Sequence, residues 1–397
     1  MQFVYIYNVR LFIFISLAII LGACASKQAE KANGEIDPAL YIYSENLGWK
    51  HKVRTKVKYH DEVLFGKVKL RGGMSSKYFK HSYTMELKLD RSIGGLPADD
   101  DWILNANYID KTFQRHKLSY DLFREMSSAN RAPKSAYLPL YLNDNYEGLY
   151  VAMQKVNGSW LNFDKEAPGK ACLFKDAFIF VEEVLDNVQE PDNYYQQKFP
   201  DLATVDYKSE LDELRHFIFN ASDQEFDTRV GDLFDLRNVI DWQLLLMLTN
   251  NHDGLYKNFY IYRLPHESKF SFIPWDYDHS FGRDGDYTLN LIENELGWEK
   301  MPLFKRLMSS ETLNYPEKLK KQWLELRQSI FTEAHIFNLI DENTNMLKPF
   351  LTANTEKWPN ESEWYLDANN YDQEIAILKK FVPMRLKQLD EFFNTLE

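Results

Sequence analysis

The feature that most constrains the fold is a change in hydrophobic period along the chain. Between residues 47 and 90 the pattern is typical of strands, with period-2 alternation in residues 63–70 and 82–89. From Met301 onward, apolar residues recur at the spacing of one helix face and predict three or more helices. A β-rich N-terminal lobe followed by a mainly helical C-terminal lobe predicts an α+β fold in two lobes.

The region between these two parts predicts elements of both kinds. The expected helices cover residues 112–126, 211–219 and 236–249. Two hairpins are expected from paired strand patterns around turn residues, one in residues 137–153 around Asn143–Asn145 and one in residues 258–274. Residues 157–207 mix both patterns and predict no particular element.

The N-terminus predicts export from the cytoplasm. Arg10 precedes an apolar run, Leu11–Leu21, which is typical of a signal peptide and shorter than the roughly 20 residues of a membrane-spanning helix. The following residues, Leu21-Gly22-Ala23-Cys24, resemble the lipobox of bacterial lipoproteins, in which the cysteine receives a lipid. An ordinary signal peptide followed by a chance cysteine is the alternative. The expectation is a 1–23 signal peptide and a lipid-anchored protein of the bacterial cell envelope, in the periplasm or at the cell surface.

Composition narrows the class of protein further. With 397 residues, 45% of them hydrophobic, the chain is long enough for a large core. Its net charge of -12 argues against a general nucleic-acid binder, which needs a basic surface. The two cysteines exclude a disulfide scaffold and a cysteine-built zinc site, and lipidation of Cys24 would leave Cys172 without a disulfide partner.

One window carries four polar side chains suited to metal and acid–base chemistry. Asp253 follows an expected helix, and Asn258 comes five residues later at the start of the second hairpin; Asp276 and Asp278 follow the end of that hairpin. Asn258 and Asp276 stand at the two ends of one hairpin, so their side chains can converge on one ion; Mg²⁺ prefers such oxygen ligands together with substrate phosphates. Asp253 is left to serve as a base. The alternative is structural, because aspartates are common in turns and caps.

This order of residues is that of a protein-kinase active site: a catalytic Asp, an Asn five residues on, a hairpin and a metal-binding Asp. A kinase also needs a lysine for the ATP phosphates, and Lys80 stands just before the strand 82–89. The turn-rich loop 71–76 precedes it, and its backbone N–H groups suit a phosphate cradle. Most strand lysines are merely solvated, so Lys80 alone is a weak signal.

Taken together, these motifs resemble the CotH kinase family over residues 45–390. The matching segments are Arg71–Ser76, Lys80–Tyr83, Trp102–Asn105 with Asp110 and Lys111, Gly148–Tyr150, Asn251–Tyr262 and Ile273–Asp278 with Phe281-Gly282. The resemblance implies an atypical kinase-like domain over residues 41–395, behind a tether at 24–40. Its N-lobe would cover about residues 45–156, with an insert and the C-lobe in 157–395.

The resemblance also implies the roles of individual residues. Lys80 would contact the ATP phosphates, and Arg71 and Ser75 would shape the phosphate-facing loop. Asp253 would be the catalytic base. Asn258 and Asp276 would bind Mg²⁺ or Mn²⁺, and Asp278 would bind the same metal or support its ligands.

This chain departs from the family pattern in one strand. Many members carry an acidic residue after the Gly-Leu-Tyr motif, whereas this chain has Gln154, which cannot form an ion pair with Lys80. Either another carboxylate takes that place, for which Glu86 is near in sequence, or nucleotide binding is weakened. Kinases rely on such a pair to hold the lysine.

Two functions are consistent with these residues. The first is transfer of the γ-phosphate of ATP to Ser or Thr hydroxyls of an extracytoplasmic protein, with a divalent metal as cofactor. The second is an inactive, lipid-anchored, kinase-like binding or structural protein of the envelope. The expected partners are a protein substrate and the membrane, through the lipid on Cys24, with no nucleic acid. Neither a Walker loop nor a His-Glu-x-x-His zinc motif is present.

Overall fold

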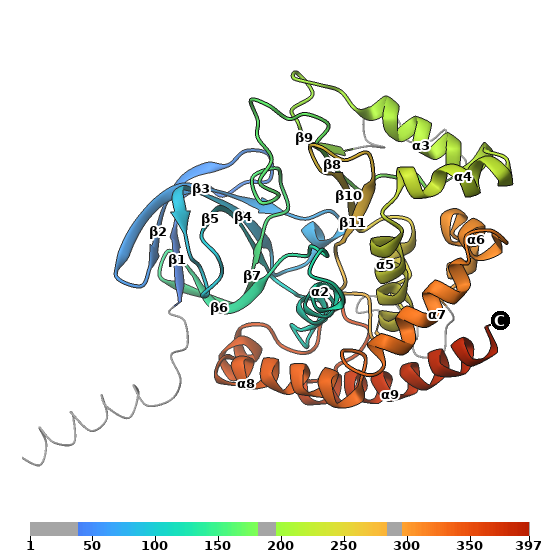
Figure 1. Cartoon of the computed structure of the whole chain (residues 1–397). Helices are drawn as coiled ribbons and strands as arrows, with labels where there is room; N and C mark the ends of the chain where they lie inside the picture. Colours follow the sequence, from blue (N-terminus) through green and yellow to red (C-terminus); the bar gives the residue numbers. More distant parts are fainter. Residues whose placement is uncertain (1–38, 182–195, 284–295, 397) are drawn as a thin grey trace, which may run out of the picture. The chain divides into compact units, whose positions relative to one another are not determined.

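The computed structural model describes residues 39–181, 196–283 and 296–396 (Figure 1). The predicted signal peptide 1–23, Cys24 and all of the tether up to Pro38 lie outside the described residues. The described part forms one compact unit that begins at Ala39. No helix within the described ranges has both the length and the apolar character that a membrane crossing requires.

The N-terminal strands close into a barrel in the order β1-β2-β3-β4-β5-β7-β6. The strands are β1 (Leu40–Tyr43), β2 (Val53–Tyr59), β3 (Glu62–Arg71), β4 (Ser82–Arg91), β5 (Asp99–Asn105), β6 (Ser135–Leu142) and β7 (Asn145–Gln154). All neighbours are antiparallel except β1 and β6, whose parallel pairing closes the barrel. In β2 and β3 alternate side chains are buried, which is why the period-2 pattern predicts these strands.

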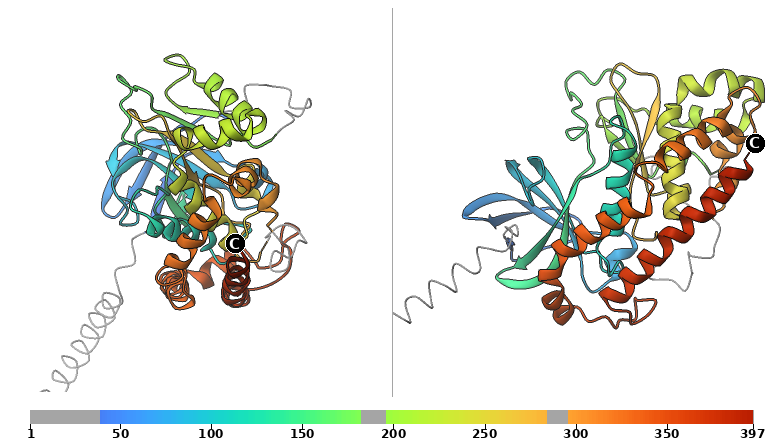
Figure 2. Two further views of the ribbon diagram at one scale, coloured as in Figure 1. Left: turned by 45° about the vertical axis from the view of Figure 1, so that its right-hand side comes forward. Right: turned by 60° about the horizontal axis from the view of Figure 1, so that its bottom comes forward.

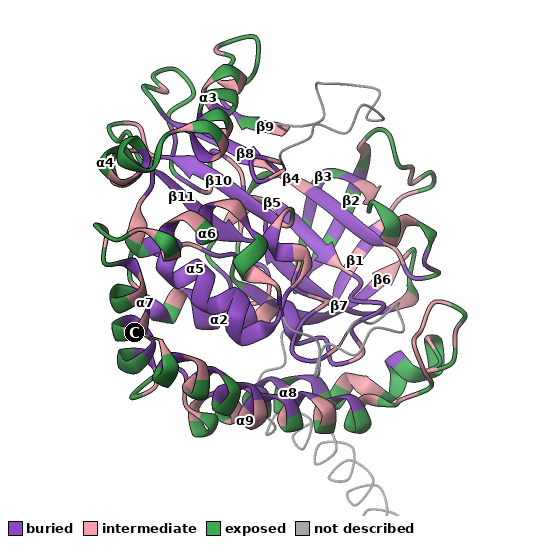
Figure 3. Cartoon of the chain, turned by 90° about the vertical axis from the view of Figure 1, so that its right-hand side faces the viewer, coloured by how far each residue is buried: buried purple, intermediate pink, exposed green. Residues whose placement is uncertain are grey.

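A second sheet of four strands lies in the other half of the chain, in the order β11-β10-β8-β9. Its strands are β8 (Cys172–Lys175), β9 (Gln196–Phe199), β10 (Phe259–Arg263) and β11 (Phe270–Pro274). Helix α5 (Leu236–Thr249) packs against β11 and is buried almost all round, as its purple colour in Figure 3 shows. Asp235 caps its first turn, and Asn250 ends it in the left-handed conformation.

Helices surround this sheet and reach back to the barrel (Figures 1 and 2). They are α2 (Arg115–Met126), α3 (Lys208–Asn220), α4 (Asp223–Leu233), α6 (Pro302–Ser309), α7 (Tyr315–Leu326), α8 (Glu333–Lys357) and α9 (Tyr371–Thr395). Helix α2 contacts both α5 and β11, whereas α8 lies beside α9 and contacts β6 and β7 of the barrel. One hydrophobic core joins α2, α5, the second sheet and the C-terminal helices.

The structure confirms the predicted α+β class, both hairpins and all the expected helices, with ends shifted by a few residues. Two features differ from the prediction. The structure shows a closed barrel and a second sheet rather than a plain pair of lobes. Residues 157–207 supply strands β8 and β9 to that second sheet. Helix α4, between two predicted helices, was not expected.

Candidate functional site

Two adjoining cavities lie where the barrel meets the second hairpin, with volumes of about 460 Å³ and about 360 Å³. Both are lined by Ser75 from the loop after β3, by Lys175 at the end of β8 and by Asp276 after β11. Arg71 lines the larger cavity. The smaller one is lined by the remaining predicted residues: Lys80, Asp253, Asn258 and Asp278. The structure therefore brings all seven residues of the predicted site to one place.

Asn258 lies at the centre of the hairpin's open end. Its backbone is left-handed, with φ +61°, and its carbonyl accepts a hydrogen bond from Trp275 N–H at 3.1 Å. Its side-chain amide donates to Asp253 Oδ2 and to the Asp276 carbonyl, each at 3.5 Å. Asparagine adopts this backbone conformation more readily than most residues, so one residue serves both the turn and the site.

Asp253 lies in a short 3₁₀ helix, Asp253–Leu255, that follows the end of α5. Its side chain is 40% exposed and forms an ion pair with Lys257 Nζ at 2.9 Å. The next residue, Gly254, is closely packed, because a Cβ there would lie 2.5 Å from Leu246 Cδ2 and would force that side chain to shift. The chain thus presents the Asp253 carboxylate to the smaller cavity from a tightly packed turn.

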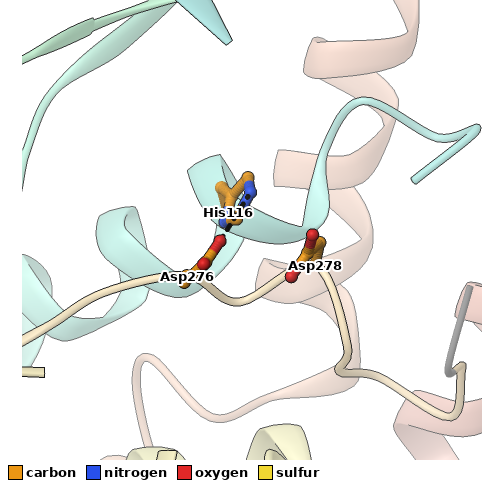
Figure 4. A group of neighbouring side chains, drawn as sticks. All are labelled: His116, Asp276 and Asp278. Carbon is orange, nitrogen blue, oxygen red and sulfur yellow. Dashed lines mark ion pairs between the residues drawn. The ribbon is translucent and has the colours of Figure 1, made fainter. Parts of the chain in front are cut away.

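Asp276 and Asp278 form a carboxylate pair after β11, beside His116 of α2 (Figure 4). Their ligand atoms and the His116 ring nitrogen all lie within 4.8 Å of one another. Burial, and after it the negative charge of Asp276, raises the pKa of Asp278 to about 6. Two carboxylates this close repel each other, and a divalent cation would relieve the repulsion. With the Asn258 amide oxygen added, these hard oxygen donors fit Mg²⁺ or Mn²⁺.

Lys80 is buried between the barrel and α8, with 2% of the residue exposed. Its ammonium donates to the carbonyls of Ala106 and Leu149 and, at 3.4 Å, to Asn354 Oδ1 of α8. Burial lowers the pKa of Lys80 well below its usual value, and the charge of Glu147 opposes that shift. All three ammonium protons therefore have protein acceptors.

The hypothesis that Glu86 pairs with Lys80 is wrong. Glu86 forms an ion pair with Lys52 instead, on the surface of the barrel, and this pairing lowers the pKa of Glu86. Gln154 is also engaged elsewhere, since its side-chain oxygen accepts from Lys134 N–H at 3.0 Å. Strand position explains both results, because Lys80 precedes β4 and its side chain is directed towards Leu149 and α8.

The end of β3 and the segment that follows it bring Arg71 and Ser75 to the larger cavity. The Arg71 guanidinium lies 5.8 Å from the centre of the Trp275 ring, the residue before Asp276. Gly72 has φ +149°, and a Cβ there would lie 2.6 Å from Ser75 Oγ. The glycine is thus required for the close approach of this loop to itself.

Two residues of the site were missed by the sequence reasoning. Lys175 lines both cavities, and its Nζ lies 2.9 Å from Asp176 Oδ2; Asp176 Oδ1 in turn accepts from Asn258 N–H at 3.3 Å. Lys175 falls in the stretch 157–207, where no pattern predicted a strand. His116 lies on the buried face of a predicted helix, and a polar residue on that face is the signal that was available.

Known proteins and protein families resemble this chain at the level of sequence and of fold. The family model described as CotH kinase protein matches residues 68–389, from β3 to the last turns of α9. The inner spore coat protein H of Bacillus subtilis (strain 168) is 24% identical over 306 residues, which are 74% of this chain and 78% of that protein. The crystal structure of the Helicobacter pylori proinflammatory kinase CtkA aligns with 91% of this chain and all of that chain, at 9% identity and a TM-score of 0.33.

Proposed function

The chain belongs to the CotH kinase protein family, and from that premise we propose that it transfers the γ-phosphate of ATP to Ser or Thr hydroxyls of an extracytoplasmic protein. One observation carries the proposal: Arg71, Ser75, Lys80 and the four residues from Asp253 to Asp278 line two adjoining cavities. ATP and the divalent metal would bind there, with the barrel and the rest of the chain as counterparts of the two kinase lobes.

Asn258, Asp276 and Asp278 are the residues that would hold Mg²⁺ or Mn²⁺. When bound, the cation neutralises negative charge on the phosphates and fixes their orientation. Although the pKa of Asp278 is raised, its value of about 6 is below neutral pH, so this carboxylate is mostly ionised there and available as a ligand. Arg71 and the backbone amides of the loop around Ser75 would contact the phosphates from the barrel side.

Asp253 would accept the proton of the substrate hydroxyl, or orient that hydroxyl for attack. Its side chain is 40% exposed at the smaller cavity, so a substrate from solution can reach it. The Asn258 amide at 3.5 Å holds one of its carboxylate oxygens and leaves the other for the hydroxyl. This positioning is the contribution that a kinase base is expected to make.

Lys80 is proposed to stabilise the phosphates because it lines the smaller cavity. Of its three acceptors, Asn354 Oδ1 is the most distant at 3.4 Å, and it is the one that the ammonium would exchange for a phosphate oxygen. The lowered pKa reflects burial without a carboxylate partner within ion-pair distance among the described residues. A phosphate would supply the missing negative charge.

The place of action is proposed from the N-terminus. Lipidation of Cys24 after removal of residues 1–23 would anchor the chain to an envelope membrane, outside the cytoplasm. The chain from Cys24 to the first strand at Leu40 is 16 residues long, enough to extend about 50 Å. The substrate would then be a protein of the same compartment.

A second function is favoured by one specific observation. Lys80 is held by backbone carbonyls and an amide, and Gln154 stands where many family members carry an acidic residue. An inactive, lipid-anchored binding or structural protein would retain the fold with this change. ATP binding separates a nucleotide-dependent enzyme from a protein that has lost the nucleotide site.

The test is thermal unfolding of the full chain with and without nucleotide. We expect Mg²⁺-ATP or Mn²⁺-ATP at millimolar concentration to raise the melting temperature of the wild type, because ligands that bind the folded state stabilise it. Asp276→Ala should abolish that rise, whereas Asp61→Ala, at an exposed residue of the β2–β3 turn, should retain it. A wild type that shows no rise would contradict nucleotide binding and favour the inactive alternative.

A further inference from the structure

We propose that His116 and Tyr120 of α2 are positioning residues that hold Asp276 in place for the metal, and that His116 is not itself a metal ligand. This inference rests on the proposed function for the metal role of Asp276. The proximity of His116 to Asp276 and Asp278 would otherwise suggest a three-ligand site made of one histidine and two aspartates (Figure 4).

The segment 276–278, which carries Asp276 and Asp278, is called the carboxylate loop here. Two of its successive backbone amides donate to side chains of one helix. Asp276 N–H donates to Tyr120 Oη at 3.0 Å, and Tyr277 N–H donates to His116 Nδ1 at 2.8 Å. His116 and Tyr120 stand four residues apart and therefore lie on the same face of α2. Both are buried, with 2% and 0% of the residue exposed.

The hydrogen bond to Tyr277 determines which nitrogen of His116 carries the proton. A backbone N–H can only donate, so Nδ1 must present its lone pair, and the neutral ring carries its proton on Nε2. Nε2 is also the nitrogen that faces Asp276, at 3.7 Å from Oδ1. A metal bound to Nε2 would need the lone pair there, which a protonated nitrogen does not offer. The ring can therefore direct an N–H towards the carboxylate, but it cannot bind the ion at the same time.

The backbone of Asp276 explains why such support is needed. Its φ is +58°, in the left-handed region that most non-glycine residues avoid. The two hydrogen bonds that the backbone amides of Asp276 and Tyr277 donate to α2 hold Asp276 in this conformation. Arg115, next to His116, extends the support, since its Nε donates to the Ser280 carbonyl at 3.0 Å.

Ring packing restricts the same loop from the side. The Tyr120 ring is nearly parallel to Trp275, with centroids 6.4 Å apart and an interplanar angle of 17°. It is also nearly parallel to His116, at 6.0 Å and 23°. Residues 275 to 277 are therefore held by α2 through both backbone and ring contacts, and Trp275 and Asp276 line the larger cavity.

The most direct test is the tautomer of His116, observed in the full chain labelled with ¹⁵N-histidine. Two-bond ¹H–¹⁵N correlation spectra, assigned with His116→Asn, should show a bare Nδ1 and a protonated Nε2 without metal. Both nitrogens should retain these states when Mg²⁺ is added. A protonated Nδ1, or loss of the Nε2 proton on addition of Mg²⁺, would overturn the positioning role.

Manganese binding separates this inference from the proposed function. Electron paramagnetic resonance titration measures the Mn²⁺ dissociation constant, and we expect His116→Ala to raise it by about 10- to 100-fold, as is usual for residues that orient metal ligands. His116→Asn should lose less affinity, because its Oδ1 can still accept from Tyr277 N–H, and His335→Ala, at a half-exposed histidine of α8, should lose none. Equal losses in His116→Asn and His116→Ala would contradict the inference.

If the proposed function itself is wrong, these measurements give a different result. If the wild type binds no Mn²⁺ while the His116 tautomer is as expected, the metal role of Asp276 is wrong, and the proposed function is wrong with it. Direct coordination would appear in the pulsed paramagnetic resonance spectrum of Mn²⁺-loaded protein as a ¹⁴N coupling that ¹⁵N-histidine changes. Such a coupling would make His116 a ligand and overturn the inference alone.

Discussion

Asp110 illustrates how a motif residue contributes through structure rather than chemistry. Its carboxylate has no exposed surface and accepts from Thr112 N–H, Thr112 Oγ1 and Arg115 N–H at the start of α2. It also forms an ion pair with the buried Arg115 guanidinium at 2.5 Å. Asp110 therefore accepts from the first backbone N–H of α2, the helix that also contacts Asp276 and Tyr277.

Replacing Asp110 by alanine should destabilise the fold strongly. Arg115 would retain only Glu374, at 3.3 Å, as a carboxylate partner among the described residues, and removing one partner of a buried ion pair costs about 3–5 kcal/mol. Urea denaturation at neutral pH measures the loss. Asp61→Ala, at an exposed turn residue, is the control and should change the unfolding free energy by less than about 0.5 kcal/mol. A loss below about 1 kcal/mol in the Asp110 variant would show that the ion pair is not required.

Sequence reasoning found the acidic residues of the site but not the side chains that support them. Asp253, Asn258 and Asp276 form a local motif around one hairpin, so their spacing predicts that they meet. His116 and Lys175 join them from α2 and β8, and only the tertiary packing brings those elements to the hairpin. A polar residue on the buried face of a predicted helix marks His116 as unusual, but a single sequence does not show which residues it meets.

At the scale of elements, the Gly-Leu-Tyr segment of β7 and helix α8 both contact the Lys80 side chain. Asn354 Oδ1 accepts from Leu149 N–H at 2.9 Å, and Trp358 Nε1 donates to the Glu147 carbonyl at 2.8 Å. Gly148 lies between these contacts with φ +128°. A Cβ there would lie 2.8 Å from Trp358 Nε1 and 3.0 Å from Lys80 Cε.

Gly148→Ala should therefore separate α8 from the barrel. Backbone strain and overpacking together should cost about 2–4 kcal/mol of unfolding free energy, measured by chemical denaturation. Gly231→Ala provides the matched control, because Gly231 lies within α4 and the nearest atom to its added Cβ is 3.7 Å away. That variant should gain about 0.5–1 kcal/mol. A neutral Gly148→Ala would contradict the close packing around Lys80.

Element prediction from the sequence succeeded where the pattern was long and local. Helix α5 is a long apolar segment, the β10–β11 hairpin has turn residues between two strand patterns, and both were predicted. The four-residue strands β8 and β9 are too short to show a period, and the β8–β9 pairing contains a register shift. They belong to the sheet through the pairing of β8 with β10, which lies more than 80 residues further along the chain.

For the molecule as a whole, a buried carboxylate in α5 makes stability depend on pH. Asp241 has no exposed side-chain surface, and burial raises its pKa from 3.8 to about 6, although Arg237, Asn130 and Gln322 oppose the shift. Because the folded-state pKa is the higher one, ionisation of Asp241 costs stability above pH 6. That cost disappears as the pH falls towards 4, and it corresponds to about 3 kcal/mol.

Asp241→Asn should remove this dependence. Within the described part of the chain Gln322 Oε1 has no hydrogen-bond partner, so the Gln322 amide can turn over and accept from the amide introduced at position 241. Urea unfolding at about pH 4.5 and pH 7 should show the variant gaining about 2 kcal/mol relative to wild type between the lower and the higher pH. Asp232→Asn, at an exposed position of α4, should show no such gain. A parallel pH dependence in Asp241→Asn and wild type would contradict the role of Asp241.

Family membership and a kinase-like site make phosphate transfer the central claim, and labelled ATP tests it most directly. The full chain, incubated with Mn²⁺ or Mg²⁺ and envelope proteins, should incorporate label from γ-labelled ATP and none from α-labelled ATP. Asp253→Asn should retain the nucleotide-dependent rise in melting temperature but lose at least about 100-fold in transfer rate, as expected when a proton-transfer group is removed. Equal labelling by wild type and Asp253→Asn would contradict the account, and so would the absence of labelling by the wild type.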